Sequence, residues 1–382
     1  MEFSVNESVA KTKNIYSTMS ATSHPRIAIL ACLVFMVCLA LPSCKKNPTQ
    51  EPDTQVPAVI YDTDIGSSTD DLFALELLYH YHDQGRCRLL GVVVDRMGDD
   101  CAACADVMNT YFGHGDMPIG LVRVGIVNPA VWIDYRGLPY YTLDDGTPMF
   151  RRSVADYSSL PDGWQLYRRL LAAEPDHSVS IVSVGFVTCL AQLLQSEGDQ
   201  YSPLDGVELV RRKVKCLYIQ GGRFGVADEG DYNFAQGIDF AQTFFRLWPS
   251  DVDIVFSPME VGQQVEYTPE QVIADIDWTD SHPVKQVDMT CDCNTGQKMW
   301  DPMVVINAVE GEGPSGCFDS VTGARLPLFS LSERGVVTLL PDAETPFTPS
   351  PEGNCRYQLP GPPAWADHML LKIRQVNMTL AH

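Results

Sequence analysis

Residues 62–71, with the sequence DTDIGSSTDD, place four aspartates within one short stretch of the chain. The preceding residues, Val56 to Tyr61, have the composition of a strand, and leucines follow the stretch at helical spacing. The acids therefore lie where a strand passes into a helix. Two unit charges about 4 Å apart repel by roughly 4 kcal/mol at an effective dielectric of about 20, so a bound cation is the simplest way to hold such a group together.

The ligands available in this stretch are carboxylate, hydroxyl and backbone oxygens, without histidine, which favours calcium or magnesium over zinc or copper. In an open α/β sheet, the turn after a strand lies at the carboxyl edge, where ligands bind. The alternative is that Asp70 and Asp71 only cap the helix. Capping does not explain Asp62 and Asp64 on the incoming strand. The stretch therefore predicts a divalent metal site.

Strand-like runs alternate with helical segments along most of the chain, and the runs fall at 88–94, 118–122, 178–183, 214–220 and 253–256. This alternation predicts an α/β fold with an open, mostly parallel sheet flanked by helices. After Arg325, short apolar runs and a closing helix from about Ala364 to Val376 predict a small β-rich C-terminal part. We expect residues 57–382 to form a single domain.

The stretch 62–71 resembles the amino-terminal signature of the inosine–uridine-preferring nucleoside hydrolase family, in the variant where two extra residues separate the glycine from the final Asp-Asp. Three later stretches are also similar to motifs of this family: VGFVT at 184–188, QGG at 220–222 followed by DYNF at 231–234, and WDP at 300–302. Family members hold one calcium ion and hydrolyse N-ribosides. The resemblance implies a nucleoside hydrolase-like fold and a secreted bacterial lipoprotein branch of the family.

The resemblance also implies a set of metal ligands. Calcium would be bound by the carboxylates of Asp64, Asp71 and Asp301 and by the backbone carbonyl of Val184. Asp64 would in addition act as the catalytic base that accepts a proton from the attacking water. Asp62 is expected to brace the loop.

Four further residues are implied to bind the substrate. Asp70 and Asn233 would hold ribose hydroxyls, helped by Asp231, which replaces a family glutamate with a shorter acid. Trp300 stands where better-known members have the histidine of His-Asp-Pro. An indole can stack on a base, but it cannot donate a proton as an acid does, so the group that activates the leaving base is unassigned.

Two other functions are compatible with parts of the sequence. A non-catalytic surface lipoprotein of the same fold would bind ribosides or glycans without turnover. A phosphatase with an aspartyl nucleophile is suggested by Asp62-Thr63-Asp64, but that class requires threonine or valine two residues after the second Asp, where this chain has Gly66. The favoured function is calcium-dependent hydrolysis of the N-glycosidic bond of a ribonucleoside or related riboside.

The first 43 residues have the layout of a secretory signal. Arg26 precedes fifteen apolar residues, Ile27 to Leu41, and the sequence Leu41-Pro42-Ser43-Cys44 resembles a bacterial lipobox. We expect residues 1–43 to be a lipoprotein signal peptide, Cys44 to carry the lipid and residues 44–56 to be a flexible tether. The protein would then be anchored in the bacterial cell envelope, either in the periplasm or on the outer-membrane surface. The alternative is an uncleaved anchor helix.

The chain is strongly acidic, with a formal net charge of −22. Without residues 1–43 it carries 24 basic and 47 acidic side chains, a net of −23. Such a surface repels phosphate backbones, which argues against a nucleic-acid partner. A small-molecule riboside remains the expected partner, and a homo-oligomeric state is left open.

Overall fold

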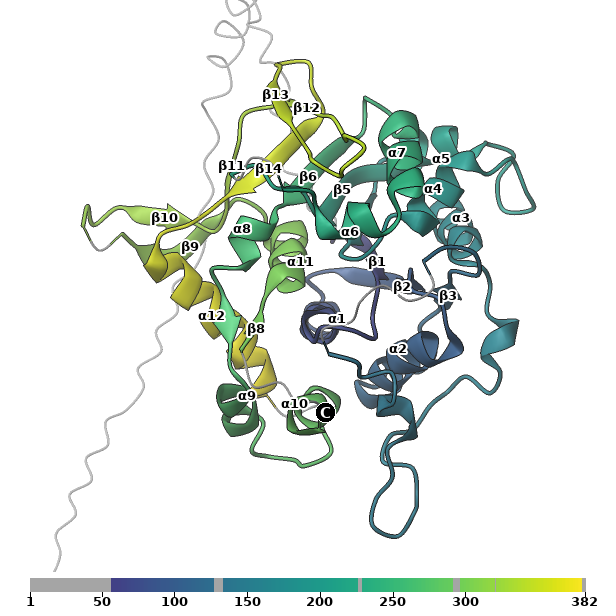
Figure 1. Ribbon diagram of the computed structural model, residues 1–382, viewed down its shortest axis with the longest axis vertical. Helices are drawn as coiled ribbons and strands as arrows, with labels where there is room; N and C mark the ends of the chain where they lie inside the picture. Colours follow the sequence, from purple (N-terminus) through teal and green to yellow (C-terminus); the bar gives the residue numbers. More distant parts are fainter. Residues whose placement is uncertain (1–55, 127–132, 226–228, 291–295, 320, 380–382) are drawn as a thin grey trace, which may run out of the picture. The chain divides into compact units, whose positions relative to one another are not determined.

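A computed structural model of the chain describes residues 56–126, 133–225, 229–290, 296–319 and 321–379. The predicted signal peptide, Cys44 and all of the predicted tether except Val56 lie outside the described residues. The described residues belong to one unit, which runs from Gln55 to His382 (Figure 1). Among the described helices, none combines the length and the apolar character that a membrane crossing requires.

The centre of this unit is a ten-stranded sheet with the order β13-β12-β14-β6-β5-β4-β1-β2-β3, in which β11 pairs with β14 outside this path. All pairings from β14 through to β3 are parallel. The parallel strands are β1 (Ala58–Thr63), β2 (Arg88–Val94), β3 (Ile119–Leu121), β4 (Val179–Ser183), β5 (Val214–Gln220), β6 (Asp253–Ser257) and β14 (Cys355–Leu359). The predicted open, mostly parallel sheet is confirmed.

The strand order reverses at β1. The chain proceeds outward from β1 through β2 to β3, and then returns to place β4 on the other side of β1, followed by β5 and β6. In open α/β sheets, ligands bind outside the carboxyl ends of the strands at such a switch point. The acidic stretch begins with the last two residues of β1, and the 184–188 stretch follows β4, so both lie at this point.

Side chains of β1 alternate between two hydrophobic cores, as expected for a strand with both faces covered. Val59 and Tyr61 belong to one core, whereas Ala58 and Ile60 belong to the other. The first core is packed by α1 (Asp70–Asp83), α2 (Asp99–Tyr111), α8 (Met259–Gly262), α9 (Pro269–Asp275), α10 (Pro283–Thr290), α11 (Trp300–Glu310) and α12 (Pro363–Asn377). The second core is packed by α3 (Gly163–Ala173), α4 (Thr188–Gln195), α5 (Gly206–Lys213), α6 (Tyr232–Gln236) and α7 (Ile238–Leu247).

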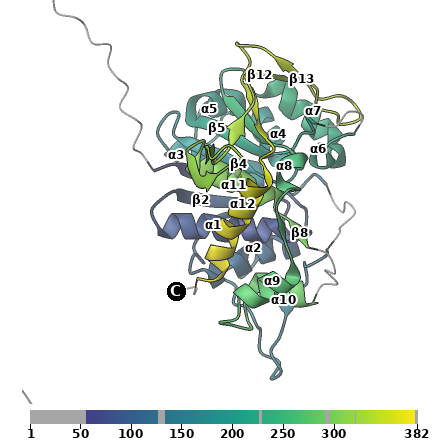
Figure 2. The same ribbon diagram turned by 90° about the vertical axis from the view of Figure 1, so that its left-hand side faces the viewer.

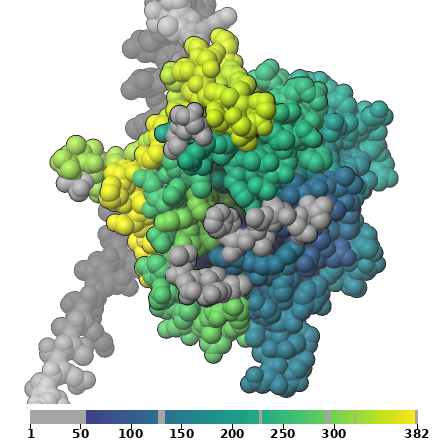
Figure 3. Space-filling view, viewed as in Figure 1, coloured from purple at the N-terminus to yellow at the C-terminus, as the bar shows by residue number. Residues whose placement is uncertain are grey.

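The C-terminal part is β-rich, as predicted, but it is not separate from the main sheet. β14 pairs in parallel with β6, while β12 and β13 extend the same sheet in antiparallel fashion. The yellow surface of this part adjoins the green surface of the preceding segments (Figure 3). The helix α12 then lies against α1 (Figure 2). The remaining elements are η1 (Leu138–Tyr140), η2 (Tyr157–Ser159), β7 (Glu266–Tyr267), β8 (Gln297–Lys298), β9 (Pro314–Phe318), β10 (Arg325–Pro327), β11 (Ser330–Leu331), β12 (Gly335–Val337) and β13 (Phe347–Pro349).

Candidate metal and substrate site

One cavity of about 150 Å³ lies at the carboxyl edge of the parallel strands. Every residue that the sequence predicts for metal binding, catalysis or substrate binding lines it: Asp64, Asp70, Asp71, Val184, Asp231, Asn233, Trp300 and Asp301. These residues come from the ends of β1 and β4, from the loop after β5 and from the first turns of α1, α6 and α11. The fold therefore brings together groups that lie up to 237 positions apart in the chain.

The turn between β1 and α1 has an unusual backbone. Gly66 has a φ of +124°, and a side chain there would approach Arg136 and Cys101 to within 3.0 and 3.2 Å. Ser68 has a φ of +67°, a left-handed conformation that is uncommon for residues other than glycine. The Ser68 hydroxyl donates a 2.5 Å hydrogen bond to Oδ1 of Asp70. This bond orients the first acid of α1.

Carboxylate oxygens of Asp70, Asp71 and Asp301 lie within 4.8 Å of one another, and all three side chains are buried. Gln297 of β8 connects the two segments that carry these acids. Its Oε1 accepts a hydrogen bond from the backbone N–H of Thr69 at 3.3 Å, and its Nε2 donates one to Oδ1 of Asp70 at 3.3 Å. The residues just before α11 are thereby attached to the start of α1.

Burial and mutual repulsion raise the pKa values of these acids. The pKa of Asp301 is raised well above its ordinary value by burial, and then by the charges of Asp70, Asp71 and Asp64. Burial, followed by the charges of Asp64 and Asp70, also raises the pKa of Asp71. Burial raises the pKa of Asp70 to about 7. Such crowding of acids is relieved when a cation binds between them.

Asp64 differs from the other acids because it has a cationic partner. Arg96, which follows β2, donates from Nη2 to Oδ2 of Asp64 and from Nε to the Asp64 carbonyl, both at 2.7 Å. The guanidinium also lies 5.2 Å from the centre of the Phe186 ring. The pKa of Asp64 is raised above its ordinary value by burial, although the charge and hydrogen bond of Arg96 oppose this rise. The charge of Asp64 is therefore offset by a direct ion pair.

The turn after β4 presents a backbone carbonyl to the cavity. The carbonyl oxygen of Val184 accepts a 3.1 Å hydrogen bond from the amide nitrogen of Asn233, and the same nitrogen donates to Oε1 of Gln220 at 2.6 Å. A carbonyl oxygen has two lone pairs, so one remains for a metal ion. The amide oxygen of Asn233 takes part in neither of these bonds.

Asp231 caps the short helix α6 and braces the preceding glycine turn. Its Oδ1 accepts from the backbone N–H of Phe234 at 3.0 Å, and its Oδ2 accepts from that of Gly222 at 2.8 Å. Burial nevertheless raises the pKa of Asp231 to about 6. This acid thus has a structural role, in addition to the predicted contact with the substrate.

Trp300 lies at the start of α11, and its indole N–H donates a 3.1 Å hydrogen bond to the carbonyl of Met259. A side chain added at Gly262 would lie 2.6 Å from Cδ1 of this indole, so the glycine allows α8 to pack directly on it. The ring is therefore held in one orientation, with its only N–H already bonded.

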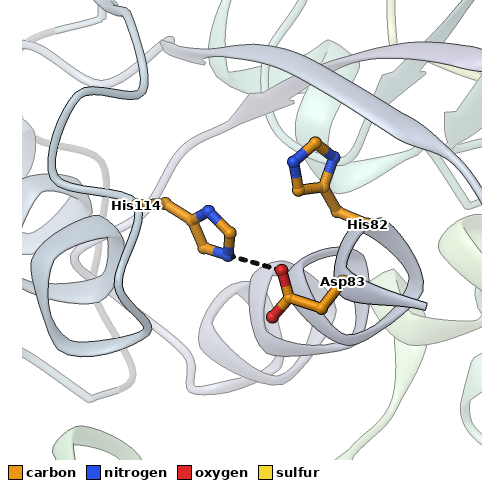
Figure 4. Close-up of side chains that lie close together, drawn as sticks. All are labelled: His82, Asp83 and His114. Carbon is orange, nitrogen blue, oxygen red and sulfur yellow. Dashed lines mark ion pairs between the residues drawn. The ribbon is translucent and has the colours of Figure 1, made fainter. Parts of the chain in front are cut away.

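A second group of three potential metal ligands, His82, Asp83 and His114, also has its donor atoms within 4.8 Å of one another (Figure 4). His114 Nε2 lies 3.2 Å from Oδ1 of Asp83. However, Nδ1 of His82 accepts a 3.1 Å hydrogen bond from the backbone N–H of Leu89, which puts the proton of the neutral ring on Nε2. Neither nitrogen of His82 is then free to bind a metal. The Asp70–Asp71–Asp301 group is the better candidate, and it contains two of the three predicted aspartate ligands, Asp71 and Asp301, with Asp70 in place of Asp64.

Gly185 offers a test of how closely Asp64 must be positioned. A Cβ at this residue would lie 2.4 Å from the backbone nitrogen of Asp64 and 2.8 Å from its Oδ1. We expect Gly185→Ala to displace Asp64. The rate of a reaction in which Asp64 takes part should then fall by about 10²-fold, since displacements near 1 Å have costs of that order. The control is Gly313→Ala, whose new Cβ has one neighbour at 3.8 Å. Equal activity of both variants would contradict the prediction.

The sequence prediction missed several residues that line the cavity: Arg96, Gln220, Tyr232 and Met259. A signal for Arg96 was present, because it comes two positions after the end of a predicted strand, at the edge where ligands bind. Tyr232 lies between the two predicted residues Asp231 and Asn233. Met259 had no comparable signal, because its place depends on how α8 packs beside α11.

Comparisons with known proteins support the fold. Neither models of protein families nor curated proteins yield a match to the sequence. Among solved structures, the chain is similar to a purine-preferring ribonucleoside hydrolase from Gardnerella vaginalis, with a TM-score of 0.59 and 13% identity over 84% of this chain and 99% of that one. It is also similar to an inosine–uridine preferring nucleoside hydrolase from Bacillus anthracis, with a TM-score of 0.58 and 15% identity over 84% and 99% of the two chains.

A third similar structure is a type III effector protein, XopQ, complexed with adenosine diphosphate ribose. Its TM-score is 0.58 and its identity 15%, over 85% of this chain and 94% of that one. The protein therefore has the α/β fold of the nucleoside hydrolases. At these identities, the similarity establishes the fold but not the activity.

Proposed function

We propose that the protein is a calcium-dependent hydrolase of the N-glycosidic bond of a ribonucleoside or related riboside. The observation that carries this proposal is the convergence of Asp301, at the start of α11, with the Asp64–Asp71 turn in one cavity. Buried acids that repel one another have a high cost unless a cation or protons compensate them. The nucleoside hydrolase fold supports the same function.

The donor groups fit calcium by their chemistry. They are carboxylate oxygens of Asp64, Asp71 and Asp301 and the carbonyl oxygen of Val184, and calcium prefers hard oxygen ligands of this kind. Imidazole and thiolate groups, which favour zinc, are not found among the described lining residues. A calcium ion bound here would supply a Lewis-acidic centre that makes a water molecule easier to deprotonate.

The residues of the chain would carry out the other steps. Asp64, held by Arg96, accepts the proton of the attacking water. Asp70 and the amide oxygen of Asn233 hold ribose hydroxyls, and Asp231 supports the turn that positions Asn233. As the bond to the base breaks, positive charge develops on the sugar, and the surrounding carboxylates stabilise it.

Calcium binding is expected to release protons near pH 7. The pKa values of Asp70, Asp71 and Asp301 are raised, so these acids keep their protons to a higher pH than an ordinary aspartate does, whereas calcium requires carboxylates. The affinity for calcium should therefore fall as the pH is lowered. Titration calorimetry in buffers of different ionisation enthalpy measures the released protons. A heat that does not depend on the buffer would contradict this expectation.

Ribose release from a panel of ribosides tests the function directly, with the purified protein in calcium and in excess chelator. We expect turnover in calcium and its loss in chelator. The alternative is a non-catalytic riboside- or glycan-binding protein of the same fold. Tight, calcium-dependent binding of a riboside without any product would support that alternative and would exclude the hydrolase.

We further propose, on the sequence of residues 1–44 alone, that the protein acts in the cell envelope with a lipid on Cys44. The residues that carry this proposal lie outside the described ranges. Metabolic labelling with a fatty acid tests it. The label should appear in the wild type and disappear in Cys44→Ser, and an unlabelled wild type would exclude the anchor.

A further inference from the structure

We propose that the preferred substrate is a riboside whose leaving base carries a fixed positive charge, such as a pyridinium riboside. This proposal rests on the hydrolase function given above and names the class of substrate for the same cavity. Two features of the described lining carry it: the sign of the charge in the cavity, and an aromatic side chain that is fixed in orientation and already bonded at its only polar atom.

The first feature is the excess of carboxylates. Five aspartates line the cavity: Asp64, Asp70, Asp71, Asp231 and Asp301. Among the described lining residues, the one cationic side chain is Arg96, and both of its bonds to Asp64 direct it toward that acid. Once calcium binding has displaced the protons from these acids, their carboxylates outweigh one guanidinium and a divalent ion together. The field in the cavity therefore favours a cationic ligand over an anionic one.

The second feature is the pair of aromatic side chains, Trp300 and Tyr232, that line the same cavity. Trp300 is held by Met259 and Gly262, as described above. The hydroxyl of Tyr232 is engaged in a hydrogen bond with Arg96. The indole N–H and the tyrosine oxygen thus each have a partner within the protein. The ring faces of Trp and Tyr attract cations, and the attraction increases when the cation is desolvated.

The chemistry of the reaction leads to the same class of substrate. A neutral base leaves as an anion unless an acid protonates it while the bond breaks. A pyridinium base leaves as a neutral molecule, because the electron pair of the C1′–N bond returns to the positively charged nitrogen. Water then adds to C1′ and its proton goes to Asp64, so the products are ribose, a neutral base and one proton. This route requires no acid at the position of Trp300.

The positive charge also moves in a favourable direction during this reaction. In the bound substrate the charge is on the base, where the aromatic side chains attract it. As the bond breaks, the charge passes to the ribose ring, beside which the proposal places Asp64, Asp70 and Asn233. Carboxylates that lie where this positive charge develops lower the barrier of the reaction.

The experiment measures the release of ribose by the full chain in calcium, with nicotinamide riboside and with inosine as substrates. We expect kcat/KM to be about 100-fold higher for nicotinamide riboside, since the acid that inosine needs contributes about 10²–10⁴-fold in enzymes that have one. In Trp300→His, which introduces an ionisable group, the ratio should shift toward inosine. Trp300→Phe keeps an aromatic ring without adding an acid and should keep the preference.

Pyridinium ribosides also have a weaker glycosidic bond, which by itself makes them easier to hydrolyse. A binding measurement involves no bond cleavage and therefore tests the recognition of charge alone. The cation 1-methylnicotinamide and neutral nicotinamide differ by one methyl group and one charge. We expect the cation to bind about tenfold more tightly, and this difference to disappear in Trp300→Leu. Inosine cleaved as fast as nicotinamide riboside, with equal binding of the two amides, would overturn this proposal and leave the hydrolase intact. No turnover of any riboside would overturn both.

Discussion

Replacing Asp64 with asparagine is expected to lower the turnover number for riboside hydrolysis about 10³-fold or more, since a general base alone contributes about 10²–10⁴-fold. Asparagine has nearly the same size and still accepts the hydrogen bond that Arg96 donates to Oδ2. It does not accept a proton from water, and it is a weaker ligand for calcium than a carboxylate. Steady-state release of ribose in saturating calcium measures the loss.

The same substitution at Asp62 provides the control. Asp62 is fully buried at the end of β1, two residues before Asp64, and its carboxylate accepts a 2.7 Å hydrogen bond from the Tyr167 hydroxyl. It does not line the cavity. We expect Asp62→Asn to keep turnover within about tenfold of the wild type. Equal losses in the two variants, with unchanged thermal unfolding, would show that Asp64 has no special part in the reaction.

The grouping of the acids was predictable because the rule that brings them together is topological. Each parallel strand ends at the same edge of the sheet, so residues that follow strands become neighbours regardless of their distance in sequence. Asp64 follows β1, Val184 follows β4 and Asn233 lies in α6, the first helix after β5. Asp301 was predicted from the resemblance of its Trp-Asp-Pro motif, since it begins a helix and follows only the two-residue strand β8.

The partners of these acids were not predictable in the same way. Arg96 could be placed near the edge, but nothing in its local sequence indicates that it pairs with Asp64 rather than with another acid. Gln297 contacts Asp70 across 227 positions of the chain, and that contact depends on how β8 packs. Side-chain partners of this kind are selected by three-dimensional packing, which a pattern of residue types does not determine.

Strand pairing in the C-terminal part could not be predicted from the sequence for a similar reason. Its β-rich character follows from short apolar runs and frequent prolines. The pairing of β14 with β6 does not, because Cys355 pairs with Ile254, about a hundred positions earlier. A short strand carries little information about its partner, since register and partner are set by the faces that must be buried.

Asp301→Asn is expected to have opposite effects on stability with and without calcium. In chelator, the variant should be more stable than the wild type, because it removes one of several buried acids that repel one another. In calcium, the wild type should become the more stable protein, because a ligand present at about 100 times its Kd adds about 2.7 kcal/mol. The variant, which lacks this ligand, should gain little. Thermal unfolding in calcium and in chelator measures both effects.

The pH dependence of the stability, together with a second variant, shows whether repulsion between the buried acids causes the effects of Asp301→Asn. Asp301 has a raised pKa in the folded protein, so folding is favoured while the acid is protonated, and this stability is lost as the pH rises from the ordinary value toward the raised one. In chelator, the gain in stability from Asp301→Asn should therefore grow with pH.

Asp275 provides the control variant. It is also buried, but it pairs with Arg374 at 2.6 and 2.8 Å. Asp275→Asn should lower stability with or without calcium, because it removes a compensated charge. If Asp301→Asn behaved in the same way, the acids at the β1 turn would not form a calcium site.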